Sequence, residues 1–399
     1  MIKFLHTADL HLGKIFHDQS LVEDQTFMLG ELSVILKDGS YAALIIAGDV
    51  YDRSIASTEA VELFGSFLGE IKNRQPSLEV LIIPGNHDSP SRLGFGRELF
   101  ARLGIRFGVS AEACDKPVIV KRDSESCAFF LLPFLNPGVL SESAYRMEKA
   151  RRALGGIPSV LVAHLFASGG EEAGSERLFL GNAELVRIEL FKGFDYIALG
   201  HLHRCQSVGT SAVGINAVRK KAWYSGSPLA YSFGEASSGR DEKCFLSVGL
   251  GKDGLKVEKI PVRPMRKVTS LSGPFSRFVN GLSTDKELLA AVDDYLEIRL
   301  TDKRITENAR ELLRKRFPHL LSLRQDEALA GLSSGARFHV SANGMQGGRR
   351  DVSADFRNFL LDLYGEAPDI SAEMELFNKL LAEVESADTS NDLSEEGPP

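Results

Sequence analysis

Short apolar runs and longer amphipathic stretches alternate along the first half of the chain. Five runs have the length of strands, and most are apolar on both faces: residues 2–8, 42–47, 80–84, 159–163 and 196–199. Runs of this kind are typical of strands buried within a sheet. Apolar residues at helical spacing lie between several of them, at residues 23–36, 57–72 and 93–103. This alternation predicts a layered α/β fold.

Each of the five runs ends next to a side chain that can bind a metal. The runs are followed in turn by D-L-H, G-D-V-Y-D, G-N-H-D, a single histidine and G-H-L-H. Ligands of open α/β sheets bind beyond the carboxyl ends of the strands, so we expect these side chains to converge. The candidate metal ligands are Asp9, His11, Asp49, Asn86, His164, His201 and His203.

Each candidate has an ordinary structural interpretation when it is taken alone. Asp9 is typical of a turn or a helix cap, Asn86 of a turn, and His164 of a buried core histidine. Residues two apart in an extended chain project to the same side, so His201 and His203 can face one point, although such pairs also occur by chance. Taken together, the seven candidate ligands that follow five successive apolar runs favour a metal site.

The seven candidates mix carboxylate and amide oxygens with imidazole nitrogens. This mixture suits Mn²⁺, Fe²⁺ or Zn²⁺ rather than Ca²⁺ or a thiolate zinc site. Seven ligands are too many for one tetrahedral ion and suit two ions that share a bridging carboxylate. Two cations about 3.5–4 Å apart can bridge a hydroxide and stabilise an in-line displacement at phosphorus. His87 follows Asn86 and would lie beside the ions without binding them, which suits a role at the leaving oxygen.

The motifs resemble, in their order along the chain, those of the calcineurin-like metallophosphoesterase superfamily: D-x-H, G-D-x-x-D, G-N-H-D, a single H and G-H-x-H. Within it, the stretches HTADLHLGK, PGNHDSPSRL, ALGHLHR and YSGSPLAYSFGE resemble the nuclease subunits of bacterial SbcCD complexes. The resemblance extends over roughly residues 1–324. It implies the calcineurin-like metallophosphoesterase fold, a layered β-sandwich flanked by helices, with a small α+β capping domain and C-terminal helices.

The resemblance also implies a role for each candidate residue. One ion would be held by Asp9, His11, Asp49 and His203, and the other by Asp49, Asn86, His164 and His201, with Asp49 as the bridge. His87 would stabilise or protonate the departing 3′-oxygen, and Asp52 would orient His87. For Asp88, capping of the following helix is favoured over orientation of His87. The implied cofactor is a pair of divalent ions, with Mn²⁺ expected before the others.

This resemblance and the change of sequence pattern near Pro264 predict five segments. Residues 1–264 form the metallophosphoesterase nuclease domain, 265–325 the capping domain, 326–350 a linker, 351–386 a helical segment that binds a partner and 387–399 a disordered acidic tail. The capping domain is predicted to contain a strand at residues 295–301 and a helix near residues 305–317. Two amphipathic helices are expected around residues 356–363 and 376–384.

Composition and charge are those of an ordinary globular protein, with 43% hydrophobic and 25% charged residues. No apolar run reaches the roughly 18 residues of a membrane span and the start lacks a signal-peptide pattern, so we expect a cytoplasmic protein without a membrane partner. The net charge of the chain is −7. Residues 366–399 have a net charge of −9, so the remaining residues have a net charge of +2. Basic clusters at residues 219–221, 263–267 and 314–316 could contact phosphates, although each, taken singly, is more typical of a solvated face.

The cysteines and the remaining histidines give no second site. Cys114, Cys127, Cys205 and Cys244 lie far apart without a C-x-x-C pair, which argues against a disulfide framework and against a cysteine zinc site. Cys205 is expected to be a reduced, partly buried thiol. Four histidines are expected to be structural or surface residues: His6, His17, His319 and His339.

The function that the resemblance implies is metal-dependent cleavage of DNA, as a 3′→5′ exonuclease on duplex ends and a single-strand endonuclease in repair, recombination and hairpin processing. The implied partner is an SbcC-like coiled-coil ATPase, with the chain forming a homodimer within a heterotetramer. The family dimerises through the helix faces at residues 57–72 and 93–103, although core packing equally explains these apolar stripes. The alternatives are a small-molecule or cyclic-nucleotide metallophosphodiesterase, which keeps the same metals, and a non-catalytic scaffold, which would normally have lost ligands.

Overall fold

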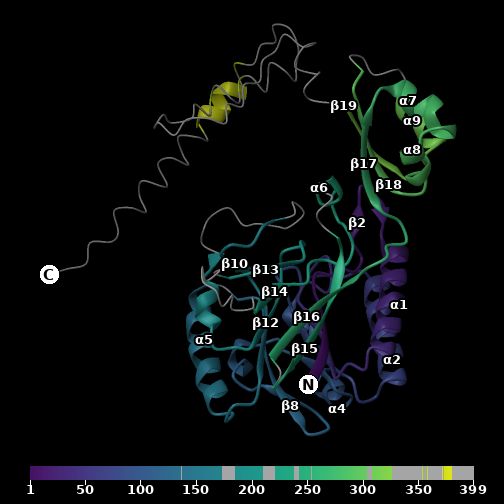
Figure 1. The fold of residues 1–399 in the computed structure, drawn as a ribbon. Helices are drawn as coiled ribbons and strands as arrows, with labels where there is room; N and C mark the ends of the chain where they lie inside the picture. The colour runs from purple at the N-terminus through teal and green to yellow at the C-terminus, as the bar shows by residue number, and fades with distance from the viewer. Residues whose placement is uncertain are drawn as a thin grey trace, which may run out of the picture. The chain divides into compact units, whose positions relative to one another are not determined.

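The chain divides into two compact units, Met1–Gly335 and Ala336–Pro399, in this computed structural model. The structure describes residues 1–135, 137–172, 185–209, 221–237, 242–252, 254–302 and 308–325, and, of the second unit, residues 353, 357, 371 and 373–379. Figure 1 shows the arrangement of the helices and strands.

Two six-stranded sheets form the centre of the first unit. The first has the order β16-β15-β1-β4-β5-β6 and consists of β1 (Ile2–Thr7), β4 (Ala43–Ala47), β5 (Glu79–Ile83), β6 (Ile105–Phe107), β15 (Cys244–Gly251) and β16 (Gly254–Pro261). The second has the order β13-β14-β12-β9-β8-β7 and consists of β7 (Val118–Arg122), β8 (Glu125–Leu132), β9 (Ser159–His164), β12 (Tyr196–Gly200), β13 (Gln206–Val208) and β14 (Ala222–Tyr224). Strands β1, β4 and β5 run parallel in the first sheet, and β8, β9 and β12 run parallel in the second.

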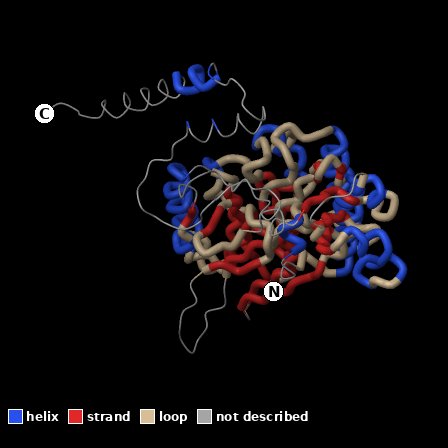
Figure 2. Tube along the Cα trace, turned by 90° about the horizontal axis from the view of Figure 1, so that it is seen from above, coloured by secondary structure: helices blue, strands red, loops and turns tan. Residues whose placement is uncertain are grey.

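The two sheets pack face to face, and helices cover their outer faces (Figure 2). Phe4, Phe129 and Tyr196 are fully buried between the sheets, where the Phe4 ring meets the other two rings edge to face. Helices α1 (Val22–Asp38) and α2 (Thr58–Arg74) pack on the first sheet, and α5 (Pro137–Arg152) with the short η3 (Ile188–Phe191) packs on the second. This layered β-sandwich flanked by helices is the predicted fold class.

All five predicted strands are present, as β1, β4, β5, β9 and β12. They belong to two sheets rather than one, since β9 and β12 lie in the second sheet. The predicted helices at residues 23–36 and 57–72 are α1 and α2. The helix predicted at residues 93–103 is shorter than expected: α3 (Pro90–Leu93) ends at the first residue of that range, and α4 (Arg97–Arg102) begins after Gly96, whose φ is 71°.

A third sheet, β17-β18-β19, forms the region that follows the sandwich. Its strands are β17 (Val268–Gly273), β18 (Tyr295–Leu300) and β19 (Leu320–Gln325), and its helices are α7 (Phe275–Asn280), α8 (Lys286–Ala290) and α9 (Ala309–Arg314). Its apolar core, which includes Phe278 and Phe317, is separate from those of the sandwich. The predicted strand at residues 295–301 is β18, and the predicted helix at 305–317 is α9, although residues 303–307 lie outside the described residues.

Asp24 of α1 anchors this third sheet to the sandwich. Its Oδ2 accepts hydrogen bonds from the Tyr295 hydroxyl at 2.6 Å and from Arg266 at 3.1 Å. Arg266, from the basic cluster at residues 263–267, is therefore engaged in an ion pair rather than presented to solvent.

Several predictions concern residues that the structure does not describe. The linker at residues 326–350 and the acidic tail at 387–399 lie outside the described residues, as does most of 351–386. Within the last range, residues 373–379 are helical, in agreement with the second predicted helix. Among the described residues, no helix is long and apolar enough to cross a membrane.

Candidate metal centre

The structure brings all seven candidate ligands together where the carboxyl ends of the two sheets meet. They follow or end β1, β4 and β5 of the first sheet and β9 and β12 of the second. Six of the seven are at most 4% exposed, and Asn86 is partly buried. The arrangement therefore depends on contact between the sheets and not on one strand edge alone.

Asp49 lies between two imidazoles at the centre of this group. Its Oδ1 accepts a hydrogen bond of 2.9 Å from the backbone N–H of His87. Its Oδ2 lies 3.7 Å from Nε2 of His11 and 3.5 Å from Nε2 of His164. One carboxylate oxygen is thus fixed by the backbone, while the other faces a donor nitrogen on each side.

The other donor atoms form one group on each side of Asp49. On one side, Nε2 of His11 and Nε2 of His203 are 3.1 Å apart. On the other, Oδ1 of Asn86 is 2.9 Å from Nε2 of His164 and 3.2 Å from Nδ1 of His201. A carboxylate oxygen of Asp9 lies within 4.8 Å of donor atoms from both groups, namely those of His11 and His203 and those of Asp49 and His164.

These separations match those between ligands of a shared ion. Two ligands about 2.1 Å from one cation and about 90–110° apart are about 3.0–3.4 Å from each other. The contacts of 3.1, 2.9 and 3.2 Å fall in or near this range. The donor set therefore fits divalent ions, and Asp49 would contribute its carboxylate from between the two groups.

Three of the four imidazoles place a second ring nitrogen next to an acceptor oxygen. Nδ1 of His164 donates to the carbonyl of Ala47 at 2.9 Å. Nδ1 of His11 and Nδ1 of His203 each lie near a carboxylate oxygen, at 3.5 and 3.6 Å. Histidines that bind metals usually hold their second nitrogen in this way, because it fixes the tautomer and the ring orientation. Two Nε2 atoms that both lack a proton repel each other at 3.1 Å unless a cation lies between them.

The protonation states also suit metal binding. Burial lowers the pKa of His11 to about 4 and lowers the pKa of His164. Burial acts to raise the pKa of Asp49, but the nearby His164, His11 and His87 outweigh it and lower this pKa to about 2. Near neutral pH, both histidines are neutral and Asp49 is ionised, which are the forms that bind cations.

Several of these residues have an unusual backbone conformation. Asp9, His11, Asp49 and His201 have φ values of 54°, 44°, 48° and 111°. Such conformations cost non-glycine residues about 1–3 kcal/mol each, and they are concentrated at functional sites. Hydrogen bonds of 3.0 Å from the backbone N–H groups of Asp9 and His11 to the loop that follows β4 help to hold the strained turn.

Glycines of the motifs give the ligands room. A Cβ on Gly48, whose φ is 92°, would lie 2.1 Å from Nδ1 of His164. A Cβ on Gly85 would lie 2.1 Å from Oδ1 of Asp49. Each glycine thus allows a ligand of another strand to approach the backbone closely.

His87 lies beside the centre, where one of its ring nitrogens is within 4.8 Å of donor atoms of His11 and Asp52. Its ring packs edge to face on His11, with 4.7 Å between the ring centroids. Its Nδ1 is 2.8 Å from the backbone carbonyl of Asp52, to which it donates. This bond leaves Nε2 as the nitrogen that is available to a substrate.

Two aspartates differ from expectation. The Asp52 carboxylate was predicted to orient His87, but the backbone carbonyl of Asp52 does so, while Oδ1 pairs with Lys14 at 2.8 Å and lies 3.5 Å from Nδ1 of His11. Asp88 does not cap the following helix, so this prediction was wrong: its carboxylate accepts from the backbone N–H groups of Val50, Tyr51 and Gly85 at 2.9–3.0 Å. Asp88 therefore ties the loop after β4 to the loop after β5.

Sequence reasoning missed the residues that support the ligands from behind. Glu235 lies next to His203, and Lys14 pairs with Asp52. Glu235 is part of the stretch YSGSPLAYSFGE, in which a single acid follows an aromatic-rich turn, but no spacing rule connects it with His203. Of the remaining histidines, His6 is buried between the sheets, 3.0 Å from the Tyr196 hydroxyl, and burial lowers its pKa to about 3. His339 lies outside the described residues.

Comparison with known proteins places the sequence among the phosphoesterases. A family model described as calcineurin-like phosphoesterase matches residues 2–205, and one described as the Type 5 capsule protein repressor C-terminal domain matches residues 261–343. The SbcD subunit of the nuclease SbcCD from Staphylococcus epidermidis is 28% identical over 338 residues, which cover 81% of this chain and 85% of that protein.

Two similar solved structures each cover 66% of this chain. TT1561 of Thermus thermophilus is 12% identical, with a TM-score of 0.40 and 99% of its own chain covered. A dimetal phosphatase from Danio rerio is 10% identical, with a TM-score of 0.37 and 97% of its own chain covered.

The first family model spans just over half of the 399 residues and includes every candidate ligand. It confirms the predicted fold class, and the donor set within it fits divalent metals. The chain belongs to the calcineurin-like phosphoesterase family.

Proposed function

We propose that the chain is the nuclease subunit of an SbcCD-type complex and hydrolyses DNA phosphodiesters. The observation that carries this proposal is the meeting of two donor groups that share Asp49, with His87 beside them. Similarity to the SbcD subunit of the nuclease SbcCD over 81% of the chain supports DNA as the substrate. The proposal comprises 3′→5′ exonuclease activity on duplex ends, endonuclease activity on single strands and a role in repair and recombination in the cytoplasm.

The metal ligands are proposed to be divided between two ions. Asp9, His11, Asp49 and His203 would hold one, and Asp49, Asn86, His164 and His201 the other. Divalent ions held there would polarise the phosphodiester and activate a water for in-line attack. Mn²⁺ is the proposed metal because imidazoles share this site with carboxylate and amide oxygens, and Mn²⁺ binds both classes of ligand.

His87 is proposed to act at the leaving oxygen. The bond from its Nδ1 to the Asp52 carbonyl directs Nε2 away from the protein backbone. Nε2 can then stabilise the departing 3′-oxygen or give it a proton. Asp52 contributes through its backbone, and its carboxylate supports His11 instead.

The second unit is proposed to bind an SbcC-like coiled-coil ATPase. Residues 373–379 are helical, and Leu376 is 60% exposed. A short helix that presents a large apolar side chain is suited to docking in a groove of a partner. The segment proposed for this contact is residues 351–386.

The chain is also proposed to form a homodimer through α2 and α4. Most apolar residues of α2, such as Phe64, are buried. Val61 is different, since it is 49% exposed. Leu99 and Leu103, within and just after α4, are 68% and 58% exposed. Core packing explains the buried residues of α2 but not the exposed apolar residues of either helix, and a contiguous exposed apolar patch marks an interface.

Replacing both Leu99 and Leu103 by glutamate is expected to convert the dimer into a monomer, because the charges would be buried at the interface. Light scattering coupled to size-exclusion chromatography measures this change. The matched control replaces Leu289 and Leu312 of the third sheet's helices, which are 52% and 43% exposed, and should leave the dimer intact. A wild-type protein that is monomeric at micromolar concentration would contradict the proposed dimer.

The proposed function is tested with the full-length chain, Mn²⁺ and duplex DNA labelled at either the 5′ or the 3′ end. We expect shortening from the 3′ end and, on circular single-stranded DNA, internal cleavage. An SbcC-like ATPase with ATP should accelerate cleavage of the duplex. Hydrolysis of bis-p-nitrophenyl phosphate without any cleavage of DNA, even with that ATPase present, would support the small-molecule phosphodiesterase instead.

A further inference from the structure

Glu235 is a buried acid that lies behind the proposed metal ligand His203. It belongs to the short helix α6 (Phe233–Ser237) and is 3% exposed. Its Oε1 is 3.6 Å from Nδ1 of His203 and also accepts a hydrogen bond from the backbone N–H of Tyr231 at 3.2 Å. The backbone thus holds the carboxylate in place beside the imidazole.

The two ring nitrogens of His203 face different neighbours. Nε2 faces Nε2 of His11 at 3.1 Å, inside the donor group, and Nδ1 faces Glu235. An imidazole that binds a cation through Nε2 must carry its proton on Nδ1. A carboxylate next to Nδ1 favours that tautomer and orients the ring, as carboxylates do behind histidine ligands of metals.

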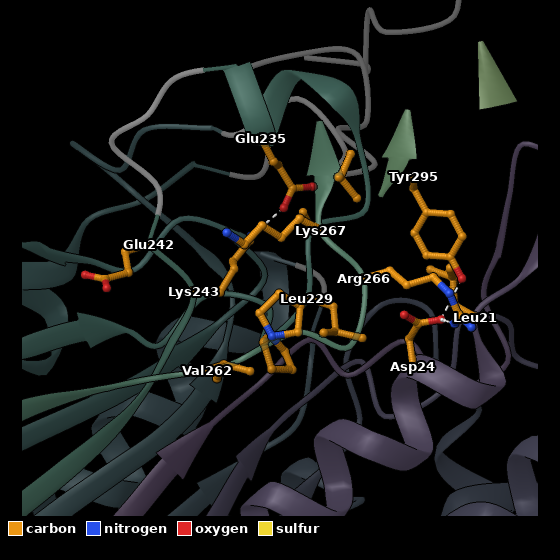
Figure 3. A pocket seen from close by; sticks show the side chains of 14 residues that line it. Leu21, Asp24, Leu229, Glu235, Glu242, Lys243, Val262, Arg266, Lys267 and Tyr295 are labelled. Carbon is orange, nitrogen blue, oxygen red and sulfur yellow. Dashed lines mark hydrogen bonds and ion pairs between the residues drawn. The ribbon is translucent and has the colours of Figure 1, made fainter. Parts of the chain in front are cut away.

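Lys243 contacts both Glu235 and the main chain of His203. Its ammonium group forms an ion pair with Oε2 of Glu235, which is visible in Figure 3. It also donates to the backbone carbonyl of His203 at 3.0 Å and to Oγ of Ser227 at 2.9 Å. The side chain and the main chain of His203 therefore contact the two members of one ion pair, in which Glu235 is buried and Lys243 is partly buried.

We propose that Glu235 and Lys243 are positioning residues that fix the tautomer and orientation of His203, and so set the affinity of the metal site to which His203 belongs. This inference rests on the proposed function, because it assigns His203 to one of two ion sites. It concerns that site, since both residues contact His203 directly, whereas the donor group of Asn86 lies on the other side of Asp49.

A purely structural role is the competing explanation. The pair also lines a cavity of 550 Å³ between the sandwich and the third sheet (Figure 3), and an ion pair at such a place can stabilise the fold alone. The two explanations differ in their effect on metal binding. If the role is structural, removing the pair lowers the stability of the fold and affects the binding of both ions alike. If the role is positioning, removing the pair lowers the affinity for one ion and leaves the affinity for the other unchanged.

The test titrates the metal-free, full-length protein with Mn²⁺ and follows binding by calorimetry and by electron paramagnetic resonance. Glu235→Gln is expected to weaken one of two binding events by ~10- to 100-fold and to leave the other unchanged. Nitrogen NMR of the histidine rings should show a protected Nδ1–H for His203 in the wild type that is lost in the variant. The matched control is Glu297→Gln, which removes an equally buried acid from an ion pair with Arg299, far from His203 in the third sheet.

A second variant removes the effect of an unpaired lysine. Glu235→Gln combined with Lys243→Met leaves no buried charge without a partner, so the fold should recover stability while the weak site stays weak. If the double variant regains wild-type affinity, or if Glu235→Gln binds two ions as tightly as the wild type, the positioning role is refuted. A wild-type protein that binds fewer than two Mn²⁺ would instead refute the metal centre of the proposed function.

Discussion

Replacing His87 by glutamine is expected to slow phosphodiester cleavage by about 10²- to 10⁴-fold while two divalent ions still bind, because a proton donor at the leaving oxygen contributes that much. Glutamine has a similar size and offers an amide in place of the imidazole. None of the contacts among His11, His203, Asn86, His164 and His201 involves the His87 side chain, so we expect these ligands to keep their positions. The measurement is the single-turnover rate on end-labelled DNA with saturating Mn²⁺, together with the number of ions bound.

The matched control for His87 is His319→Gln, since this histidine packs on Tyr295 in the third sheet and lies outside the centre. It should cleave DNA at the wild-type rate. If His87→Gln also cleaves at that rate with two ions bound, the leaving-group role assigned to His87 is incorrect. If it loses an ion, His87 is a ligand and the division into two donor groups must be revised.

Replacing Asp49 by asparagine is expected to have the largest effect of all, with loss of at least one ion and a fall in cleavage of ~10³-fold or more. A metal ion contributes several kcal/mol to the stabilisation of transition-state charge, and about 1.4 kcal/mol corresponds to a factor of ten in rate. Asparagine can still accept the bond from the His87 backbone at Oδ1 but cannot place a negative oxygen between His11 and His164. Metal content after gel filtration and the cleavage rate measure the two effects.

Asp24→Asn is the control for Asp49, because Asp24 is equally buried and its carboxylate binds Arg266 and Tyr295 rather than the centre. This variant should retain both ions even if the contact with the third sheet loosens. An Asp49→Asn protein that binds two ions with wild-type affinity would show that Asp49 is not a bridge.

The strands that carry the ligands could be predicted because they are apolar on both faces and short, a pattern that depends only on local sequence. The hairpin of β15 and β16 has no comparable signal. Ser247 and Gly249 interrupt the apolar run of β15, and its partner β1 lies at the other end of the domain in sequence. The exposed strand β16 alternates polar and apolar residues, and only the pairing with β15 identifies its place.

The metal ligands could also be predicted, since each follows its strand directly, whereas their supports could not. Asp52 occupies the second aspartate position of the G-D-x-x-D motif, from which its carboxylate was expected to bind His87. In the structure, the backbone carbonyl of Asp52 accepts the hydrogen bond from His87 instead. Asp88 sits where a helix cap is common, yet folding brings three backbone N–H groups of two loops to its carboxylate. Glu235 reaches His203 through tertiary packing, which no spacing along the chain encodes.

The division of the ligands between two sheets has a thermodynamic consequence. Asp9, His11, Asp49 and Asn86 come from the first sheet, and His164, His201 and His203 from the second, so a bound pair of ions would act as a cross-link between halves of the sandwich. Only the docked sheets offer a complete set of ligands, and mass action then adds about 2.7 kcal/mol of stability at a metal concentration one hundred times the dissociation constant. A chelator should therefore lower the melting temperature of the whole sandwich in addition to abolishing cleavage.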